Sequence, residues 1–269
     1  MSRIALGLEY DGAAFCGWQT QPGGCSVQDA LERALSEIAG HPAATVCAGR
    51  TDAGVHALGQ VVHFDTPARR PPSAWVRGVN ALLPPAAGVL WAQEVDEDFH
   101  SRYGALARTY LYYLLERPQR PALAASRVGW FHLALSVEKM QQAAECLLGE
   151  HDFSAFRAAE CQAKSPVRTL TRLQIERHGA LLRFELRANA FLQHMARNIV
   201  GSLVYVGCGR QSVPWLLEVL ESRDRSRAAP TFSAAGLYLA KVEYPARWQL
   251  PPAQDPATLE AILVPFQAT

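Results

Sequence analysis

The chain opens with a strand pattern followed by a helix pattern. The run RIALGLEY at residues 3–10 is typical of a β-strand, and the pair Asp11-Gly12 is typical of the turn that ends one. Ser26 suits a helix N-cap because Asp29 stands three residues further on, and Gly40 suits the C-terminal stop. The apolar residues between these ends recur at helical spacing: Val27, Leu31, Leu35 and Ile38.

Similar patterns continue along the rest of the chain. They predict strands at residues 60–65, 88–95, 106–115, 170–178, 180–188 and 235–244, and helices at 73–82, 136–149 and 190–206. The helix at Ser26 and the helix at Ser136 both begin with Ser-Val and end at a glycine, which is a weak internal repeat. Mostly antiparallel strands with segregated helices predict an α+β fold of two related halves, each with a sheet flanked by helices.

These patterns suggest a domain organisation. We expect an N-terminal half at residues 1–104, a C-terminal half at 105–247 and a Pro-rich tail at 248–269. The first 104 residues carry a net charge of −4 and the rest a net charge of +5, which together give the formal +1 of the chain. This asymmetry favours a polyanion bound mainly by the second half, although drift in composition accounts for it equally well.

Composition excludes several classes of protein. No run approaches the roughly 18 consecutive apolar residues of a membrane-spanning helix, and the first residues lack the apolar core of a signal peptide. We therefore expect a cytoplasmic protein without a membrane partner. None of the cysteines forms a C-x-x-C pair, so we expect free thiols rather than a metal site. The six are Cys16, Cys25, Cys47, Cys146, Cys161 and Cys208.

The segment AGRTDAGVHA at residues 48–57 is the most unusual in the chain. It is small and polar, with a glycine near each end, and it lies between a predicted strand end and the strand at 60–65. Arg50, Asp52 and His56 are therefore expected on a loop, where catalytic groups are commonly found. An arginine–aspartate pair that braces a turn is an equally good interpretation of these residues alone.

Here the sequence resembles a known family. The run GRTDAGVHALGQVVHF, which begins at Gly49, resembles the active-site motif of the tRNA pseudouridine synthase A (TruA) family. Other blocks match this family in order across residues 3–247: YDGAAFCGWQTQ with SVQDALERAL, ARTYLYYLL, GEHDFSAF, FLQHMARNIVGSLVYVG and APTFSAAGLYLAKVEY. The resemblance implies the pseudouridine synthase fold and the isomerisation of uridine in tRNA.

The implied reaction needs few groups. It breaks the N1–C1′ bond, turns the uracil and rejoins it through C5, so the oxidation state is unchanged and we expect no cofactor. It needs one ionised carboxylate, which the motif assigns to Asp52, and the arginine that pairs with that carboxylate matches Arg197. Attack at C1′, attack at C6 and removal of the C2′ proton all remain open for Asp52. The alternative for Arg197 is a solvated helix residue.

Other positions match residues of the family that contact RNA or uracil. Tyr110 matches the active-site tyrosine, which would stack on uracil and take the C5 proton, although core packing is a strong alternative in a strand with three tyrosines. Leu237 matches an apolar residue of the uracil pocket. Arg50 matches an arginine that enters the RNA stack when the target base flips. His56 shares that loop, and we place it with the substrate-binding residues.

A basic stretch in the second half is a candidate phosphate track. Residues 157–172 contain four cationic side chains and one acid, and we assign Arg168 and Arg172 to RNA binding. A solvated, charge-rich loop is the alternative interpretation.

The resemblance also implies partners. It implies tRNA as substrate, uridines 38, 39 and 40 of the anticodon arm as targets, and a homodimer in which one tRNA spans both subunits. We expect no metal. Two competing functions remain: a non-catalytic RNA-binding module, and a metal-dependent hydrolase whose ligands would be Asp52, His56, His63 and Asp65.

Overall fold

The computed structural model describes residues 1–263, which divide into two compact units. Unit 1 comprises Met1–Ala107 and Tyr238–Pro256, and unit 2 comprises Arg108–Leu237 and residues 257–263. Residues 238–256, which the sequence analysis assigned to the second half and the tail, pack in unit 1. The end of the predicted tail, beyond residue 263, lies outside the described residues.

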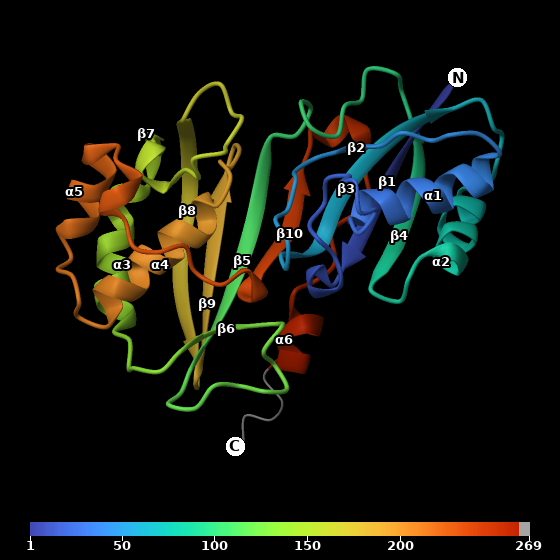
Figure 1. Cartoon of the computed structure of the whole chain (residues 1–269). Helices are drawn as coiled ribbons and strands as arrows, with labels where there is room; N and C mark the ends of the chain where they lie inside the picture. The colour runs from blue at the N-terminus through green and yellow to red at the C-terminus, as the bar shows by residue number, and fades with distance from the viewer. Residues whose placement is uncertain (264–269) are drawn as a thin grey trace. The chain divides into compact units, whose positions relative to one another are not determined.

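The sheet of unit 1 has the strand order β4–β1–β3–β10. Its strands are β1 (Ser2–Tyr10), β3 (His56–Thr66), β4 (Ala87–Val95) and β10 (Leu237–Glu243), and the short β2 (Val46–Cys47) pairs with β3. β1 is antiparallel to both β3 and β4, whereas β10 is parallel to β3. Figure 1 shows β10, in red, beside β3, in teal, so strands from opposite ends of the sequence meet in one sheet.

Helix α1 (Val27–Ala39) has the ends and the buried face that the sequence predicts. The Ser26 side chain accepts from the amide of Asp29, the Asp29 carboxylate accepts from the amide of Ser26, and Gly40 ends the helix at a φ of +75°. Its buried residues follow the helical repeat: Val27, Leu31, Ala34, Leu35 and Ala39. Local signals at both ends and one apolar stripe are sufficient to specify this helix.

The helix predicted at 73–82 is less regular. It consists of a π-helical turn, η2 (Ala74–Gly78), followed by α2 (Val79–Leu82), and the Ser73 side chain does not cap it. Leu83 is extended because the proline after it disfavours helical backbone, so the helix ends where predicted. Gly78 leaves room for Ile38 of α1, since a Cβ at this position would lie 2.8 Å from the Ile38 Cδ1 atom.

Unit 2 has a sheet with the order β5–β9–β8–β7, in which all neighbours are antiparallel. The strands are β5 (Ala107–Glu116), β7 (Gly149–Asp152), β8 (Val167–His178) and β9 (Leu181–Ala188), and β6 (Gly129–Phe131) pairs parallel with β5. The helices are α3 (Val137–Ala144), α4 (Met195–Gly207), α5 (Trp215–Ser222) and α6 (Ala257–Leu263). Short 3-10 turns complete the two units: Gly12–Ala14, Glu145–Leu147, Ser154–Phe156, Arg225–Arg227, Ala234–Gly236 and Ala246–Trp248.

The mostly antiparallel strands of each unit, with the helices that accompany them, confirm the predicted α+β class. The helix predicted at 190–206 begins later, at Met195, because His194 adopts a left-handed conformation with a φ of 63°. β6, β7 and α5 were not predicted. β6 and β7 are too short to show a period, whereas α5 carries its buried residues Leu216, Val219 and Leu220 at helical spacing, a signal that the sequence analysis did not use. Across the described residues, no helix combines the length and apolar character needed to cross a membrane.

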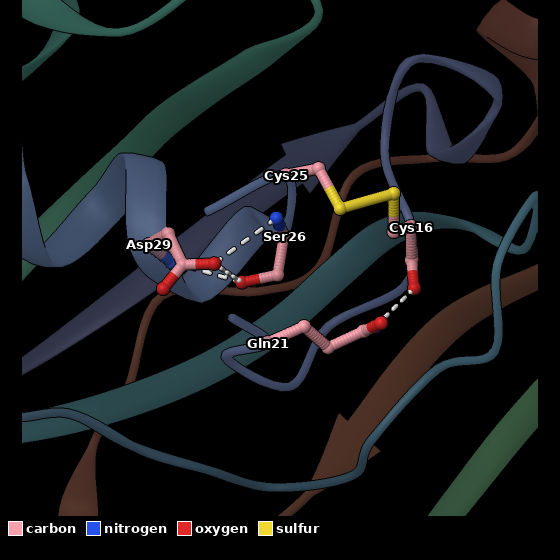
Figure 2. Close-up of a disulfide and its surroundings, with 5 residues drawn as sticks. All are labelled: Cys16, Gln21, Cys25, Ser26 and Asp29. Atoms are coloured by element: carbon pink, nitrogen blue, oxygen red, sulfur yellow. Dashed lines mark hydrogen bonds between the residues drawn. A yellow bond between two sulfur atoms is a disulfide. The ribbon is translucent and has the colours of Figure 1, made fainter. Parts of the chain in front are cut away.

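One prediction about the cysteines is wrong. Cys16 and Cys25 form a disulfide rather than two free thiols, and the amide of Cys16 also donates to the carbonyl of Cys25 at 3.0 Å. Figure 2 shows the bridge just before the Ser26–Asp29 cap of α1, with Gln21 bound to the carbonyl of Cys16. A spacing of nine residues carries no pairing signal, so only the path of the chain reveals this bond.

Replacing both bridged cysteines by serine is expected to destabilise unit 1. Loop closure over a nine-residue separation contributes about 2.5 kcal/mol in the chain-entropy description. Urea unfolding should therefore show a lower midpoint for the Cys16→Ser/Cys25→Ser protein. A reductant should lower the midpoint of the wild type and leave that of the double variant unchanged. An equal response of both proteins to reductant would contradict a stabilising bridge.

His63, which the competing metal-site interpretation used as a ligand, is a buried residue of β3. Its Nδ1 atom lies 2.9 Å from the Ser101 hydroxyl and accepts from the Ser101 amide at 3.2 Å. Burial, followed by the charges of Arg3 and His100, lowers the pKa of His63 to about 4, and Asp65 opposes this only in part. The ring is therefore neutral at physiological pH and acts as part of the core.

We expect the stability of the protein to fall as the pH falls from 6.5 to about 4. The unfolded chain takes up the His63 proton near pH 6.5 and the folded chain only near pH 4, so the unfolded state binds more protons in this window. The loss is on the order of 2 kcal/mol. In His63→Asn, which retains an acceptor for Ser101, the free energy of unfolding should depend less on pH in this window. An unchanged slope would exclude His63 as its source.

Candidate active site

The loop between β2 and β3 carries two of the predicted site residues, Arg50 and Asp52, and His56 begins β3. Arg50 is exposed, Asp52 is half-buried and Thr51 between them is buried. The amide of Val55 donates to the carbonyl of Asp52 at 3.1 Å, and Gly54 has a φ of +79°, as expected for a glycine chosen for a tight turn. In this loop the cation of Arg50 and the carboxylate of Asp52 therefore flank the buried Thr51.

A buried amide holds the start of this loop. Gln60 of β3 is fully buried, and its Nε2 atom donates to the carbonyl of Gly49 at 2.6 Å. The Gly49 amide lies 3.4 Å from the Oε1 atom of the same side chain. Both backbone groups of Gly49 therefore meet a side chain that has no access to solvent.

Unit 1 also holds the next residues of the loop. The hydroxyl of Tyr10 lies 2.8 Å from that of Thr51, and the Trp18 amide donates to the Thr51 carbonyl at 2.9 Å. Gly17 has a φ of +100°, and a Cβ there would lie 3.0 Å from the Thr51 carbonyl oxygen and 3.1 Å from the Ala53 nitrogen. The chain next to the disulfide therefore lies directly against the backbone around Asp52.

His56 is buried, whereas a residue that contacts RNA directly would be exposed. Its ring is buried, it stacks on Tyr238 at a centroid distance of 4.5 Å, and its Nδ1 atom accepts from the Gly12 amide at 3.1 Å. The same nitrogen lies 3.1 Å from a carboxylate oxygen of Asp11. A Cβ at Gly12 would lie 2.0 Å from the Val55 carbonyl oxygen, so only glycine permits this close approach. His56 joins the Asp11-Gly12 turn to the end of the loop that carries Asp52.

The neighbouring cysteine does not offer a second nucleophile. Burial raises the pKa of the Cys47 thiol to about 11, and the opposing charges of Arg50 and Arg102 do not restore it. A thiol with this pKa is protonated at neutral pH and is a poor nucleophile.

In unit 2, Tyr110 lies on β5 opposite Leu186 of β9 and is 7% exposed. Its ring contacts Phe191 edge-on at a centroid distance of 4.8 Å. The other two tyrosines of the strand are structural: the Tyr112 hydroxyl donates to the Ser233 carbonyl at 2.9 Å, and the Tyr113 hydroxyl bonds the Glu260 carboxylate. Of the three rings, only that of Tyr110 retains measurable exposure, which separates it from the two core residues.

Arg197 is not a freely solvated helix residue. It lies in the first turn of α4, is half-buried, and its Nε atom donates to the Phe232 carbonyl at 2.8 Å. The Phe232 amide in turn donates to the Arg197 carbonyl at 3.4 Å. These two bonds fix the base of the guanidinium and argue against the solvated alternative.

The chain that binds Arg197 continues directly to Leu237. A Cβ at Gly236 would lie 2.4 Å from the Tyr113 carbonyl oxygen, so this chain passes close against β5. Leu237 follows at the start of β10 and is 5% exposed. Unit 2 therefore connects two of the predicted residues, Arg197 and Leu237, through one segment, residues 232–237.

The candidate phosphate track is largely bound to its own unit. Arg157 donates to the carbonyls of Cys161 and Ala163, and Arg168 donates to the Ser165 carbonyl at 2.9 Å. Burial lowers the pKa of Arg168, and its Nε atom is buried without a hydrogen-bond partner. Arg172 pairs with Glu185 at 2.9 Å. These contacts partly satisfy the cations that the sequence assigned to RNA.

The competing metal site loses two of its four ligands. His63 bonds Ser101, and the Asp65 carboxylate binds the guanidinium of Arg3 through two bonds of 2.8 Å. Within residues 1–263, no group of three or more histidine, cysteine, aspartate or glutamate side chains is arranged to hold a metal ion.

The structure adds residues that the sequence analysis did not select. Gln60 stands in the motif itself, and Tyr10 stands in the opening block, but neither was assigned a role. A polar residue inside a strand of otherwise apolar residues was the available signal, because a buried amide requires partners.

Comparison with known proteins agrees with this geometry. A family model described as tRNA pseudouridine synthase matches residues 8–104 and 143–245. Proteins named tRNA pseudouridine synthase A from Nitrosomonas europaea and Thiobacillus denitrificans are each 58% identical to the chain. The first alignment covers 93% of this chain and 92% of the relative, and the second covers 95% and 98%. The protein of that name from Burkholderia thailandensis is 59% identical over 94% of this chain and 93% of its own.

A solved structure, the crystal structure of a Cbf5–Nop10–Gar1 complex, aligns with 88% of this chain and 48% of that chain. Its TM-score is 0.36 and its sequence identity 11%, so the assignment depends on the sequence relatives. The family model covers both halves of the chain, and the relatives extend over nearly its whole length. The chain therefore belongs to the tRNA pseudouridine synthase A family.

Proposed function

We propose that the chain converts uridine to pseudouridine in the anticodon stem-loop of tRNA, at positions 38, 39 and 40. Family membership supports the reaction and the substrate class. The observation that carries the proposal is the loop with Asp52, whose neighbours are held by buried groups while the carboxylate itself is only half-buried. A fixed carboxylate with access from outside is what this isomerisation requires.

We assign the chemical step to Asp52. In each of the three possible routes, an ionised carboxylate reacts with C1′, C6 or the C2′ proton, and no electron leaves the substrate. Arg197 is proposed to pair with this carboxylate and to keep it ionised and oriented. The bond from its Nε atom to the Phe232 carbonyl supports this role, because it fixes the orientation of the guanidinium.

Tyr110 and Leu237 are proposed to contact the displaced uracil. The small exposed fraction of Tyr110, in a strand whose other tyrosines are structural, supports a ring that is accessible at its edge. Its phenol is the candidate acceptor of the C5 proton. Leu237 would supply an apolar wall against the base.

The remaining binding residues differ in how well they suit a polyanion. Arg50 is exposed, which suits insertion into the RNA stack when a base is flipped. Arg168 and Arg172 remain proposed phosphate contacts, although local groups already bind each of them. For His56, which is buried, we propose that it supports substrate binding through the loop.

We further propose that the protein acts in the cytoplasm as a homodimer that shares one tRNA between its subunits. The cytoplasm is where tRNA is modified, and its thiols keep most disulfides reduced. The Cys16–Cys25 bridge would be exposed to reduction in that compartment.

Asp52→Asn is expected to fold, to bind tRNA with an affinity close to that of the wild type and to form no pseudouridine. The carboxamide retains the shape of the side chain and loses its charge and nucleophilicity. Tritium release from C5-labelled uridine in tRNA measures turnover, and a filter-binding assay measures affinity. Turnover within tenfold of the wild type would remove Asp52 from the mechanism.

Tyr110→Phe is expected to retain most of the affinity for tRNA and to lose at least tenfold in kcat, because stacking survives the change and the phenol does not. The same tritium assay gives kcat. Tyr113→Phe is the matched control, since that hydroxyl bonds the Glu260 carboxylate and should affect stability rather than turnover. Parallel losses of affinity and turnover in Tyr110→Phe would indicate a packing role instead.

A further inference from the structure

The catalytic loop is held at the two residues that flank Arg50. Gly49 is bound by the side chain of Gln60, and Thr51 is bound by the hydroxyl of Tyr10. All three side chains involved are buried: Gln60 is 0% exposed, Tyr10 4% and Thr51 7%. Asp52 follows Thr51 directly, so the hydrogen bond of Thr51 limits the movement of the Asp52 backbone.

Gln60 takes the place of a strand partner. β2 pairs with β3 through Cys47 and Val62, and the Ala48 amide still donates to the Val61 carbonyl at 2.8 Å. The next residue, Gly49, leaves this ladder, and the side chain of Gln60 bonds both of its backbone groups. The chain can therefore turn away from the sheet without leaving buried polar groups unsatisfied.

Tyr10 connects this amide to Thr51. The Gln60 Nε2 atom lies 3.4 Å from the Tyr10 hydroxyl, which lies 2.8 Å from the Thr51 hydroxyl. The three side chains form a continuous buried chain of hydrogen bonds under residues 49–51. In the low-dielectric interior such bonds are stiff and costly to break.

We propose that Gln60 and Tyr10 are positioning residues for Asp52. They act through Gly49 and Thr51 and set the place of the carboxylate relative to the substrate. This inference rests on the proposed role of Asp52. A displacement of about 1 Å at a reacting group can cost up to about a hundredfold in rate. Loss of the hydrogen bonds from Gln60 and Tyr10 to the loop should therefore reduce kcat and leave the affinity for tRNA nearly unchanged.

The experiment is a double-mutant cycle of Tyr10→Phe and Thr51→Val, with tritium release from labelled tRNA for kcat and filter binding for affinity. Each variant removes one side of the same hydrogen bond and retains the size of the side chain. Each is expected to lower kcat by about 10- to 100-fold. The double variant should lose no more than the worse single variant, because the second change removes nothing that remains. Gln60→Glu, which cannot donate to the Gly49 carbonyl when ionised, should also lower kcat.

Matched controls separate positioning from general destabilisation. Tyr244→Phe removes a hydroxyl of a half-buried residue that donates to the Ser101 carbonyl at 2.6 Å. Thr45→Val removes a hydroxyl that donates to the Glu32 carboxylate at 2.9 Å. Both lie in unit 1 and should lower the melting temperature to a similar extent as the cycle variants. Their kcat should stay within about twofold of the wild type.

Three results would overturn the proposal. They are a kcat within twofold of the wild type for both Tyr10→Phe and Thr51→Val, single losses that multiply in the double variant, and equal kcat losses in the two controls. Asp52→Asn, assayed in parallel, tests the proposed function separately. If Asp52→Asn were active, the proposed role of Asp52 would be wrong. If Tyr10→Phe and Thr51→Val nevertheless lowered kcat without lowering affinity, Gln60 and Tyr10 would still position the loop.

Discussion

The arrangement of the catalytic loop depends on one requirement: buried polar groups must find hydrogen-bond partners. The loop leaves the β2–β3 ladder at Gly49, which is half-buried and lies against the fully buried side chain of Gln60, so its amide and carbonyl need partners within the protein. The amide side chain of Gln60 offers one donor and one acceptor at the required place. Neither an apolar residue nor a carboxylate supplies both, which makes this position chemically demanding although it touches no substrate.

The same principle organises the candidate residues of unit 2. Arg197 projects from the first turn of α4, and one of its donors is taken by the Phe232 carbonyl. The segment that supplies this carbonyl also accepts from Tyr112 through Ser233 and ends at Leu237. Backbone carbonyls of one short segment thus fix an arginine and a core tyrosine. By contrast, the cations of the 157–172 stretch are bound mainly by carbonyls beside them in the sequence.

Local signals predicted much of the fold, and long-range contacts account for most of what was missed. The Ser26–Asp29 cap and the apolar stripe of α1 are contained in fifteen residues, so the sequence predicts this helix well. The family motif indicated the catalytic loop but not its supports, because the partners of Gln60 and Tyr10 are fixed only when β1 and β3 pair. The Cys16–Cys25 bond and the neutral, buried state of His63 are likewise properties of packing, which no spacing along the chain reports.

The composition of unit 1 from two distant segments has a consequence for how the protein is made. β10 pairs with β3, yet it is synthesised only after all of unit 2 up to Leu237 has left the ribosome. Chains emerge N-terminus first and domains fold as units, so the sheet that supports Asp52 waits unfinished while most of unit 2 is already available to fold. During this interval the edge of β3 that will receive β10 has no strand beside it, and exposed edges of this kind recruit other chains. The interval before residues 238–243 are synthesised is therefore a stage at which this protein is open to misassembly, and the pairing of β10 with β3 ends it.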